Sequence, residues 1–428
     1  KRVFISSKLK LRMFCFVEFI DSAKVIPNPE LSHHLNNLYF CAALNSKMLI
    51  QRLLKTDNLY LGNGRVIQRG MLAIDDQNRI AEVGLDLIAE GVKVEYFEGA
   101  LCPGFVNTHC HLELSHLKAK VSQKTGIHNF IVELQKVRNA SDEEKLVAIE
   151  NANYEMKVAG IVAVGDISNG DSTLKMKLDS SIYYHTFVEL FGFRTHLADS
   201  IMEQGRQLKA SFVEVGLKST VVPHSPYSVS EKLFEWIAQE KENSPICIHN
   251  QESKAENDMF ESGNGKLVEM MENFGNDMSG FRKTGKTALK SYLARLPEKG
   301  PLLLVHNTFT SSQDIDKAQL THSNLYWCFC PKANLYIEGE LPNIHQFIEK
   351  GVRGTLGTDS LASNDTLSIW EEIQTIQRAF PEISMETLIK WGTLNGAEFL
   401  GIEKELGSFE QGKRAEINWI KGEELISL

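Results

Sequence analysis

The side chains best suited to chemistry in this chain are histidines and acids that end short, strand-like segments. His109 and His111 follow GFVNT, while His249, His306 and Asp359 end ICIH, PLLLVH and RGTLGTD. Alternate side chains along a strand point to the same side, so His109 and His111 can face one point. A buried imidazole or carboxylate without a partner costs free energy, and one metal ion could satisfy all of these groups. The alternative is a hydrogen-bonded polar plug without a metal.

Three imidazoles and a carboxylate suit Zn²⁺, with Fe²⁺ or Mn²⁺ as alternatives. Such an ion lowers the pKa of its bound water to about 7 and so supplies hydroxide at neutral pH. Asp359 could also take the proton of that water, and Glu252, just after His249, could carry a proton to the substrate. His306 could orient the hydroxide or polarise the carbon that it attacks. The alternatives are a surface carboxylate for Glu252 and an outer hydrogen bond for His306.

Eight strand-like segments alternate with amphipathic helical stretches through the middle of the chain. The segments cover residues 104–109, 160–168, 182–190, 219–226, 246–252, 301–309, 325–331 and 353–359. Strands that alternate with helices predict a parallel sheet, and eight of them predict closure into a (β/α)₈ barrel of the TIM type. We therefore expect an α/β fold with this barrel over residues 101–404. Polar residues at the carboxyl ends of barrel strands are where such enzymes keep their catalytic groups.

The segments on either side of the middle region have a different pattern of apolar residues. Residues 48–100 contain short alternating apolar stretches with turn signals at 63–64 and 76–78, and residues 405–428 are similar, with a turn at 411–412. We expect these two segments to form one small composite β-sandwich. Residues 1–47 show no clear periodicity, and we treat them as an extension of uncertain status.

The composition excludes several classes of protein. The net charge of −9 and the absence of a clustered basic face argue against a nucleic-acid-binding protein. No apolar run reaches the roughly 18 residues of a membrane span. The seven cysteines are an odd number and form no CxxC pair, so neither a disulfide framework nor a thiolate metal site is expected. We expect a cytoplasmic protein with a small-molecule substrate, and a homo-oligomer is compatible with the sequence.

One further motif matches the phosphate-binding pattern GxxxxGK[ST]. It covers residues 280–287, GFRKTGKT. A phosphate loop needs a buried strand directly before it and a helix directly after it. The preceding residues, FGNDMS, do not resemble a strand, so we interpret the segment as part of a helical lid over the barrel mouth, within residues 253–300.

An ordered set of motifs over residues 50–425 resembles the amidohydrolase superfamily, and within it the cytosine-deaminase-like and chlorohydrolase-like branch, with the aminofutalosine deaminase family the most similar. The motifs are PGFVNTHCHLELSHL, SPYSVS, IHNQES, LLLVHNTF, CPKANLYI, LGTDSLASN and GSFEQGKRAEI. The resemblance implies one divalent metal ion, with ligands at His109, His111, His249 and Asp359.

The same resemblance implies proton transfer and polarisation by Glu252 and His306, and a substrate contact by His224, whose alternative is a structural cap on its strand. Asn334 and Glu113 are weaker candidates for the mouth of the site. Members with two metals carry a bridging lysine on the fourth strand. That strand here is STVVPHSP, and Lys218 lies at its other end, so we expect one metal ion.

The resulting expectation is a metal-dependent hydrolase that deaminates an aminated purine base or a nucleoside-like substrate, such as aminofutalosine or adenosine. Dechlorination or cleavage of a cyclic amide would use the same groups and is the first alternative. A barrel that binds ligands without catalysis is the second alternative.

Overall fold

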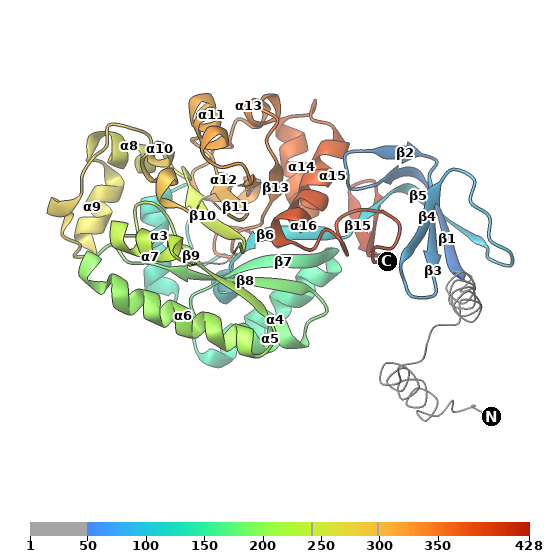
Figure 1. Ribbon diagram of the computed structural model, residues 1–428, viewed down its shortest axis with the longest axis horizontal. Coiled ribbons are helices and arrows are strands. Elements are labelled where there is room, and N and C mark those ends of the chain that lie inside the picture. The colour runs from blue at the N-terminus through green and yellow to red at the C-terminus, as the bar shows by residue number, and fades with distance from the viewer. Residues whose placement is uncertain (1–48, 241–242, 298) are drawn as a thin grey trace, which may run out of the picture. The chain divides into compact units, whose positions relative to one another are not determined.

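A computed structural model describes residues 49–240, 243–297 and 299–428 of the chain (Figure 1). The expected extension over residues 1–47 lies outside the described residues. No helix within the described ranges combines the length and the apolar composition that a membrane span needs.

All eight predicted strands of the middle region are present, and they form two parallel four-stranded sheets. The first sheet has the order β6-β7-β8-β9 and the second has the order β10-β11-β12-β13. The fold is therefore α/β with parallel sheets, as predicted. The strands are β6 (Phe105–Cys110), β7 (Ile161–Ser168), β8 (Tyr183–Leu190), β9 (Lys218–Pro223), β10 (Ile246–Asn250), β11 (Leu302–His306), β12 (Leu325–Phe329) and β13 (Gly354–Leu356).

The two parallel sheets contact one another at both ends. Cys110 at the end of β6 forms a parallel bridge with Asp359, which lies just after β13. At the other junction, the backbone N–H of His249 in β10 donates to the carbonyl of His224, one residue after β9, at 3.0 Å. Both contacts lie at the carboxyl ends of strands, where the predicted site residues are found.

Helices connect the strands and carry buried apolar residues, such as Leu233, Phe234 and Ile237 in α7. In α4 the cap Ser141 and Glu144 form a reciprocal capping box, and Ser230 caps α7. The helices are α3 (Ile127–Val137), α4 (Asp142–Val158), α5 (Leu174–Asp179), α6 (Ala198–Glu214), α7 (Glu231–Ala238), α8 (Lys254–Ser262), α9 (Lys266–Asn273), α10 (Ala288–Tyr292), α11 (Ser312–Thr321), α12 (Pro331–Ile337), α13 (Ile344–Glu349), α14 (Ile369–Ala379), α15 (Met385–Gly392) and α16 (Leu394–Leu400).

The long segment between β10 and β11 contains α8, α9 and α10. The phosphate-loop pattern at 280–287 lies in it, preceded by a short 3₁₀ turn at Met278–Gly280 and followed by the five-residue α10. No strand precedes the pattern in this described segment, so the context that a phosphate loop needs is missing.

The two ends of the described chain share one mainly antiparallel sheet, with the order β15-β14-β5-β1-β3-β4 and β2 paired to β1 (Figure 1). Asn78 closes the predicted turn between two of its strands with a φ of 57°. The strands are β1 (Ile50–Tyr60), β2 (Val66–Gln68), β3 (Met71–Asp75), β4 (Ile80–Gly84), β5 (Val94–Pro103), β14 (Ile417–Lys421) and β15 (Glu424–Ser427).

Candidate metal centre

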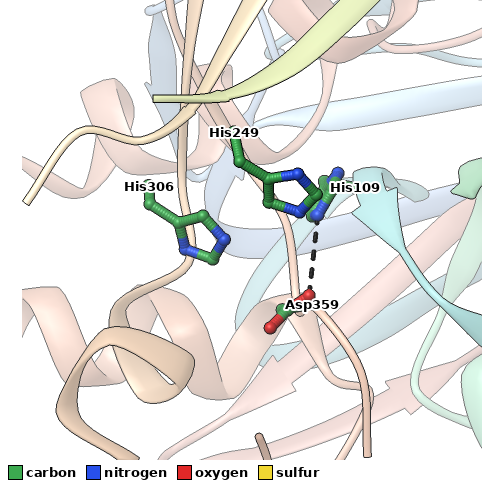
Figure 2. Close-up of side chains that lie close together, drawn as sticks. All are labelled: His109, His249, His306 and Asp359. Atoms are coloured by element: carbon green, nitrogen blue, oxygen red, sulfur yellow. Dashed lines mark ion pairs between the residues drawn. The ribbon is translucent and has the colours of Figure 1, made fainter. Parts of the chain in front are cut away.

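Four of the predicted site residues converge at the carboxyl ends of the parallel strands (Figure 2). His109 lies in β6, His249 in β10 and His306 at the end of β11, and Asp359 follows β13. One potential ligand atom from each of them lies within 4.8 Å of those of the others. None of the four is more than 6% exposed. Residues that are far apart in the sequence therefore form one buried polar cluster.

His111 lies beside this cluster, directly after β6. Its Nε2 is 3.1 Å from Nε2 of His109 and 3.3 Å from Oδ1 of Asp359. If both of these nitrogens carry a lone pair, neither can donate a hydrogen bond to the other, and the two lone pairs repel at this distance. A cation near both nitrogens would satisfy their lone pairs, as the alternation of His109 and His111 in the sequence predicts.

Hydrogen bonds at the other ring nitrogen determine the tautomers of two of the imidazoles. Nδ1 of His249 donates to the carbonyl of His224 at 2.7 Å, and Nδ1 of His306 donates to Oδ1 of Asn334 at 2.8 Å. A neutral imidazole that donates from Nδ1 presents its Nε2 lone pair. Within the described residues, Nε2 of His306 is buried without a hydrogen-bond partner. The donor set and its tautomers fit a metal ion.

The charges of the cluster also fit a cation. Burial lowers the pKa of His111 to about 4 and holds that of His249 well below its ordinary value. These imidazoles are neutral at pH 7, which is the form that binds metals. Burial opposes the ionised form of Asp359, but the hydrogen bond with His109 and the nearby imidazoles outweigh it, so the pKa of Asp359 lies well below its ordinary value.

The backbone around the second sheet is unusual. His306, Asn307 and Asp359 have φ values of 74°, 60° and 56°, and Gln251 has 44°. Residues other than glycine rarely adopt such left-handed conformations, and those that do often lie at functional sites. The Asn307 amide donates to the carbonyls of Leu304 and Cys328 at 2.9 and 3.0 Å, which holds the turn after β11 in place.

Glu252 lies on the loop between β10 and α8, with Oε1 3.6 Å from Nε2 of His306. Burial raises the pKa of Glu252 well above its ordinary value, and the charge of Asp359 adds to this effect. A raised pKa is what a carboxyl group needs in order to act as a general acid. Its backbone N–H donates to Glu256 at 3.3 Å, which anchors the loop.

His224 lies between the cluster and an apolar cavity. Its ring centroid is 4.7 Å from that of His249 and 4.2 Å from that of Phe191. The cavity has a volume of about 380 Å³, and its lining includes His224, Phe193, Met270 and Phe274. Nδ1 of His224 lies 2.7 Å from the hydroxyl of Ser228. The predicted substrate contact thus borders a space that a ligand could enter.

The two weaker candidates for the mouth of the site, Asn334 and Glu113, both make hydrogen bonds within the chain. Oδ1 of Asn334 accepts the hydrogen bond from Nδ1 of His306. Both carboxylate oxygens of Glu113 accept backbone N–H groups, from Asn169 at 2.8 Å and from Gly170 at 2.9 Å. Glu113 therefore holds the loop after β7, a contact that no motif in the sequence indicates.

The sequence also did not single out two buried acids near the cluster. Oδ1 of Asp166 in β7 accepts the backbone N–H of Leu112, next to His111, at 2.9 Å, and Oδ2 pairs with Lys177 at 2.6 Å. Glu189 in β8 lies 3.5 Å from Nδ1 of His249. Both acids lie within the last three residues of segments that were correctly predicted as strands. A polar residue near a strand's carboxyl end is the signal that could have identified them.

Comparisons with known proteins agree with this geometry. A sequence profile of the amidohydrolase family matches residues 100–426. An aminodeoxyfutalosine deaminase of Nitratiruptor sp. is 28% identical over 373 residues, which cover 83% of this chain and 88% of that protein. An adenosine deaminase of Helicobacter pylori is 26% identical over 356 residues, 79% of this chain and 84% of that protein.

Among solved structures, the aminofutalosine deaminase of Helicobacter pylori in complex with methylthio-coformycin superimposes with a TM-score of 0.75 at 23% identity. The alignment covers 86% of this chain and 91% of that chain. At this level of identity the similarity concerns the fold.

Proposed function

The chain belongs to the amidohydrolase family, and on that premise we propose that it is a metal-dependent deaminase of an aminated purine base or nucleoside. The observation that carries the proposal is the convergence of imidazoles, Asp359 and the buried Glu252 at one end of the parallel strands. The relatives named as adenosine and aminodeoxyfutalosine deaminases support this class of reaction, which is hydrolysis of a carbon–nitrogen bond outside peptides.

His109, His111, His249 and Asp359 would hold the metal ion, and Zn²⁺ suits this donor set best. A bound divalent ion would lower the pKa of water to about 7 and so provide hydroxide at neutral pH. His306 is part of the same cluster, but its Nε2 faces Glu252, so we assign it to the polarisation of the substrate. Asn334 keeps the His306 ring in that orientation.

The protein's own residues supply the proton transfers. Asp359 takes a proton from the attacking water, and Glu252 donates its proton to the ring nitrogen next to the carbon that bears the amine. Asp359 then delivers that proton to the departing ammonia, and the proton of the new hydroxyl group returns to Glu252, so that the carbonyl forms and the acid is restored. His224 contacts the base or the sugar from the side of the apolar cavity. The low pKa of Asp359 and the high pKa of Glu252 suit these opposite roles as base and acid.

We further propose that the two parallel sheets close into one (β/α)₈ barrel over residues 101–404. The bridge between Cys110 and Asp359 and the hydrogen bond between His249 and His224 support closure at the two junctions. Residues 48–100 and 405–428 would form the small β-sandwich. In support, Leu54 of β1 shares an apolar cluster with Phe409 and Ala415. The homo-oligomer and the cytoplasmic location stay predictions.

The test is ammonia release by the purified, zinc-loaded chain from adenine, adenosine, aminofutalosine, guanine and cytosine. We expect release from at least one of them. The variant that tests the acid is Glu252→Gln, which keeps the size of the side chain but removes its acidic proton. It should lower kcat by about 10²- to 10⁴-fold while the metal content stays unchanged. Silence across the panel from a chain that holds one metal ion would count against deamination.

A further inference from the structure

Helix α4 carries apolar residues on two faces. Its inner face is buried in the core, through Ile149, Ala152 and Met156. On the outer face, Val147, Tyr154 and Val158 are 51, 67 and 54% exposed. They are seven and four residues apart, so they form one stripe along the helix. Single exposed apolar residues are common on proteins, but contiguous ones are typical of an interaction site.

A groove adjoins the carboxyl-terminal half of this stripe. It has a volume of about 740 Å³, and its lining includes Tyr154 and Val158 of α4 together with Trp370 and Arg378 of α14. Tyrosine, tryptophan and arginine are enriched where proteins bind one another. Within the described residues, Arg378 makes no hydrogen bond or ion pair. The groove therefore offers aromatic surface and an unpaired cation to a partner.

The charges along α4 differ between its two ends. The first turn is acidic, with Asp142 and Glu143, whereas Lys157 lies in the last turn. Glu150 precedes Lys157 by seven residues, or about two turns, so both lie on the same side of the helix. Both side chains are exposed, and neither has a hydrogen bond or ion pair in the part of the chain that the structure describes. This surface is complementary in charge to a copy of itself that runs in the opposite direction.

We propose that the outer face of α4 and the adjoining groove form the interface of a symmetric homodimer, in which the α4 helices of two copies pack antiparallel. Two-fold symmetry makes every contact occur twice. Val147 then lies opposite Val158 of the partner subunit, and Glu150 pairs with Lys157 of the partner subunit. The acidic first turn of one α4 lies over the groove of the other copy, beside Arg378.

The size of the surface indicates that the groove takes part. Helix α4 has 17 residues and is about 25 Å long. A stable interface buries about 800 Å² on each partner, which is more than the outer face of one such helix supplies. The groove beside α14 provides the additional surface. The same surface, turned by 180°, matches both the apolar stripe and the charges, so a second copy fits it better than an unrelated partner.

The test is the mass of the purified full chain in solution, measured by light scattering and by sedimentation over a range of concentrations. We expect twice the mass of one chain. Tyr154→Glu places a charge in the stripe of both copies and should raise the Kd of the dimer by at least about 30-fold. The matched control is Leu320→Glu, at an apolar residue of α11 that is 85% exposed and lies outside this surface. It should leave the mass unchanged, and thermal melting verifies that the variants fold.

Reversal of single charges tests the antiparallel arrangement. Glu150→Lys and Lys157→Glu should each raise Kd by about tenfold or more, because each variant repels its own copy at two places. An equimolar mixture of the two variants should form a heterodimer, in which both pairs again have opposite charges. A defect in folding would not be restored by mixing.

Each contrary result would overturn the proposal. A wild-type chain that is monomeric at every concentration would show that no such dimer forms. A dimer that tolerates Tyr154→Glu would place the interface elsewhere. Charge variants that dimerise like the wild type, or weakened variants that form no heterodimer on mixing, would exclude the antiparallel arrangement. The proposed deaminase activity depends on other residues and would stand in all of these cases.

Discussion

The two parallel sheets place their polar residues in different ways. In β10–β13, left-handed residues follow three of the strands, namely Gln251, the pair His306 and Asn307, and Asp359. Among the described residues, none other than glycine has a left-handed backbone at the carboxyl ends of β6–β9. Instead, Asp166 pairs with the buried Lys177, and Glu113 holds the loop after β7 by accepting two backbone N–H groups. The second sheet and the turns after its strands thus supply three of the four residues of the buried cluster, and the first sheet supplies His109.

This difference has an energetic reason. A left-handed residue turns its side chain away from the regular strand direction at a cost of about 1–3 kcal/mol, which the surrounding packing must offset. A buried ion pair costs desolvation instead and is safe only when both partners are present. Loss of Asp359 beside the second sheet should therefore reduce catalysis, and loss of the Asp166 carboxylate in the first sheet should reduce stability.

The largest effect is expected for Asp359→Ala. The substitution removes a metal ligand and the base in one step, and we expect kcat/KM to fall by at least about 10⁴-fold with loss of bound metal. Steady-state kinetics and elemental analysis measure both quantities. Asp365→Ala, at an exposed acid six residues away, is the control and should stay within about tenfold of the wild type. Comparable losses in both variants would show that the position of Asp359 is not special.

Asp166→Ala should instead act on stability. It leaves the buried Lys177 without its carboxylate, and such a loss costs about 3–5 kcal/mol in the free energy of unfolding. Urea denaturation measures this change. The double variant Asp166→Asn with Lys177→Met, which removes both charges, should recover most of the stability. A single variant that loses less than about 1 kcal/mol would remove the contrast between the sheets.

A smaller effect on catalysis is expected for Asn334→Ala. The substitution removes the acceptor for Nδ1 of His306, a hydrogen bond worth about 0.5–1.5 kcal/mol. We expect kcat to fall by about 2- to 10-fold with little change in KM, because His306 keeps its place on β11 but loses its fixed orientation. The exposed Asn343→Ala is the control. A change confined to KM would instead place Asn334 in substrate binding.

The last effect concerns the pH dependence of stability alone, at an acid in the second half that lies outside the cluster. Burial raises the pKa of Glu372 to about 8. The folded state therefore binds this proton above the pH at which the unfolded chain releases it, so stability falls as pH rises through this range. Glu372→Gln should reduce this decrease in the free energy of unfolding by up to about 1.4 kcal/mol per pH unit. Urea denaturation between about pH 5 and pH 8 measures the slope, and parallel slopes would contradict the prediction.

The sequence predicted the strands well because strands and helices have different apolar periods. All eight strands of the middle region and the turn at Asn78 follow from these periods and from turn residues. The two ends share one sheet, whereas the closed barrel and the β-sandwich stay predictions. The adjacency of His109 and His111 follows from strand alternation alone.

The sequence could not predict interactions that depend on turns or on distant partners. Asp359 lies beyond the last residue of β13, and its position depends on a φ of 56° and on the bridge to Cys110. Lys177 lies on α5, where nothing distinguishes a lysine that pairs with a buried acid from one in solvent. The contact of Glu189 with His249 joins two strands that are not neighbours in either sheet, so no spacing rule reports it.

The sheet that joins the two ends of the chain has a consequence for synthesis. β5 pairs with β14, and more than 300 residues separate the two strands, since Cys102 pairs with Asn418. Contacts between such distant segments form slowly. During translation, β5 has no partner at this edge until residues 417–421 have left the ribosome. The parallel strands that lie between β5 and β14 in the sequence can pair before that. An unpaired strand edge can pair with other chains. A slow final stage of synthesis would therefore expose this protein to aggregation. The pairing of β14 with β5 would end that exposure.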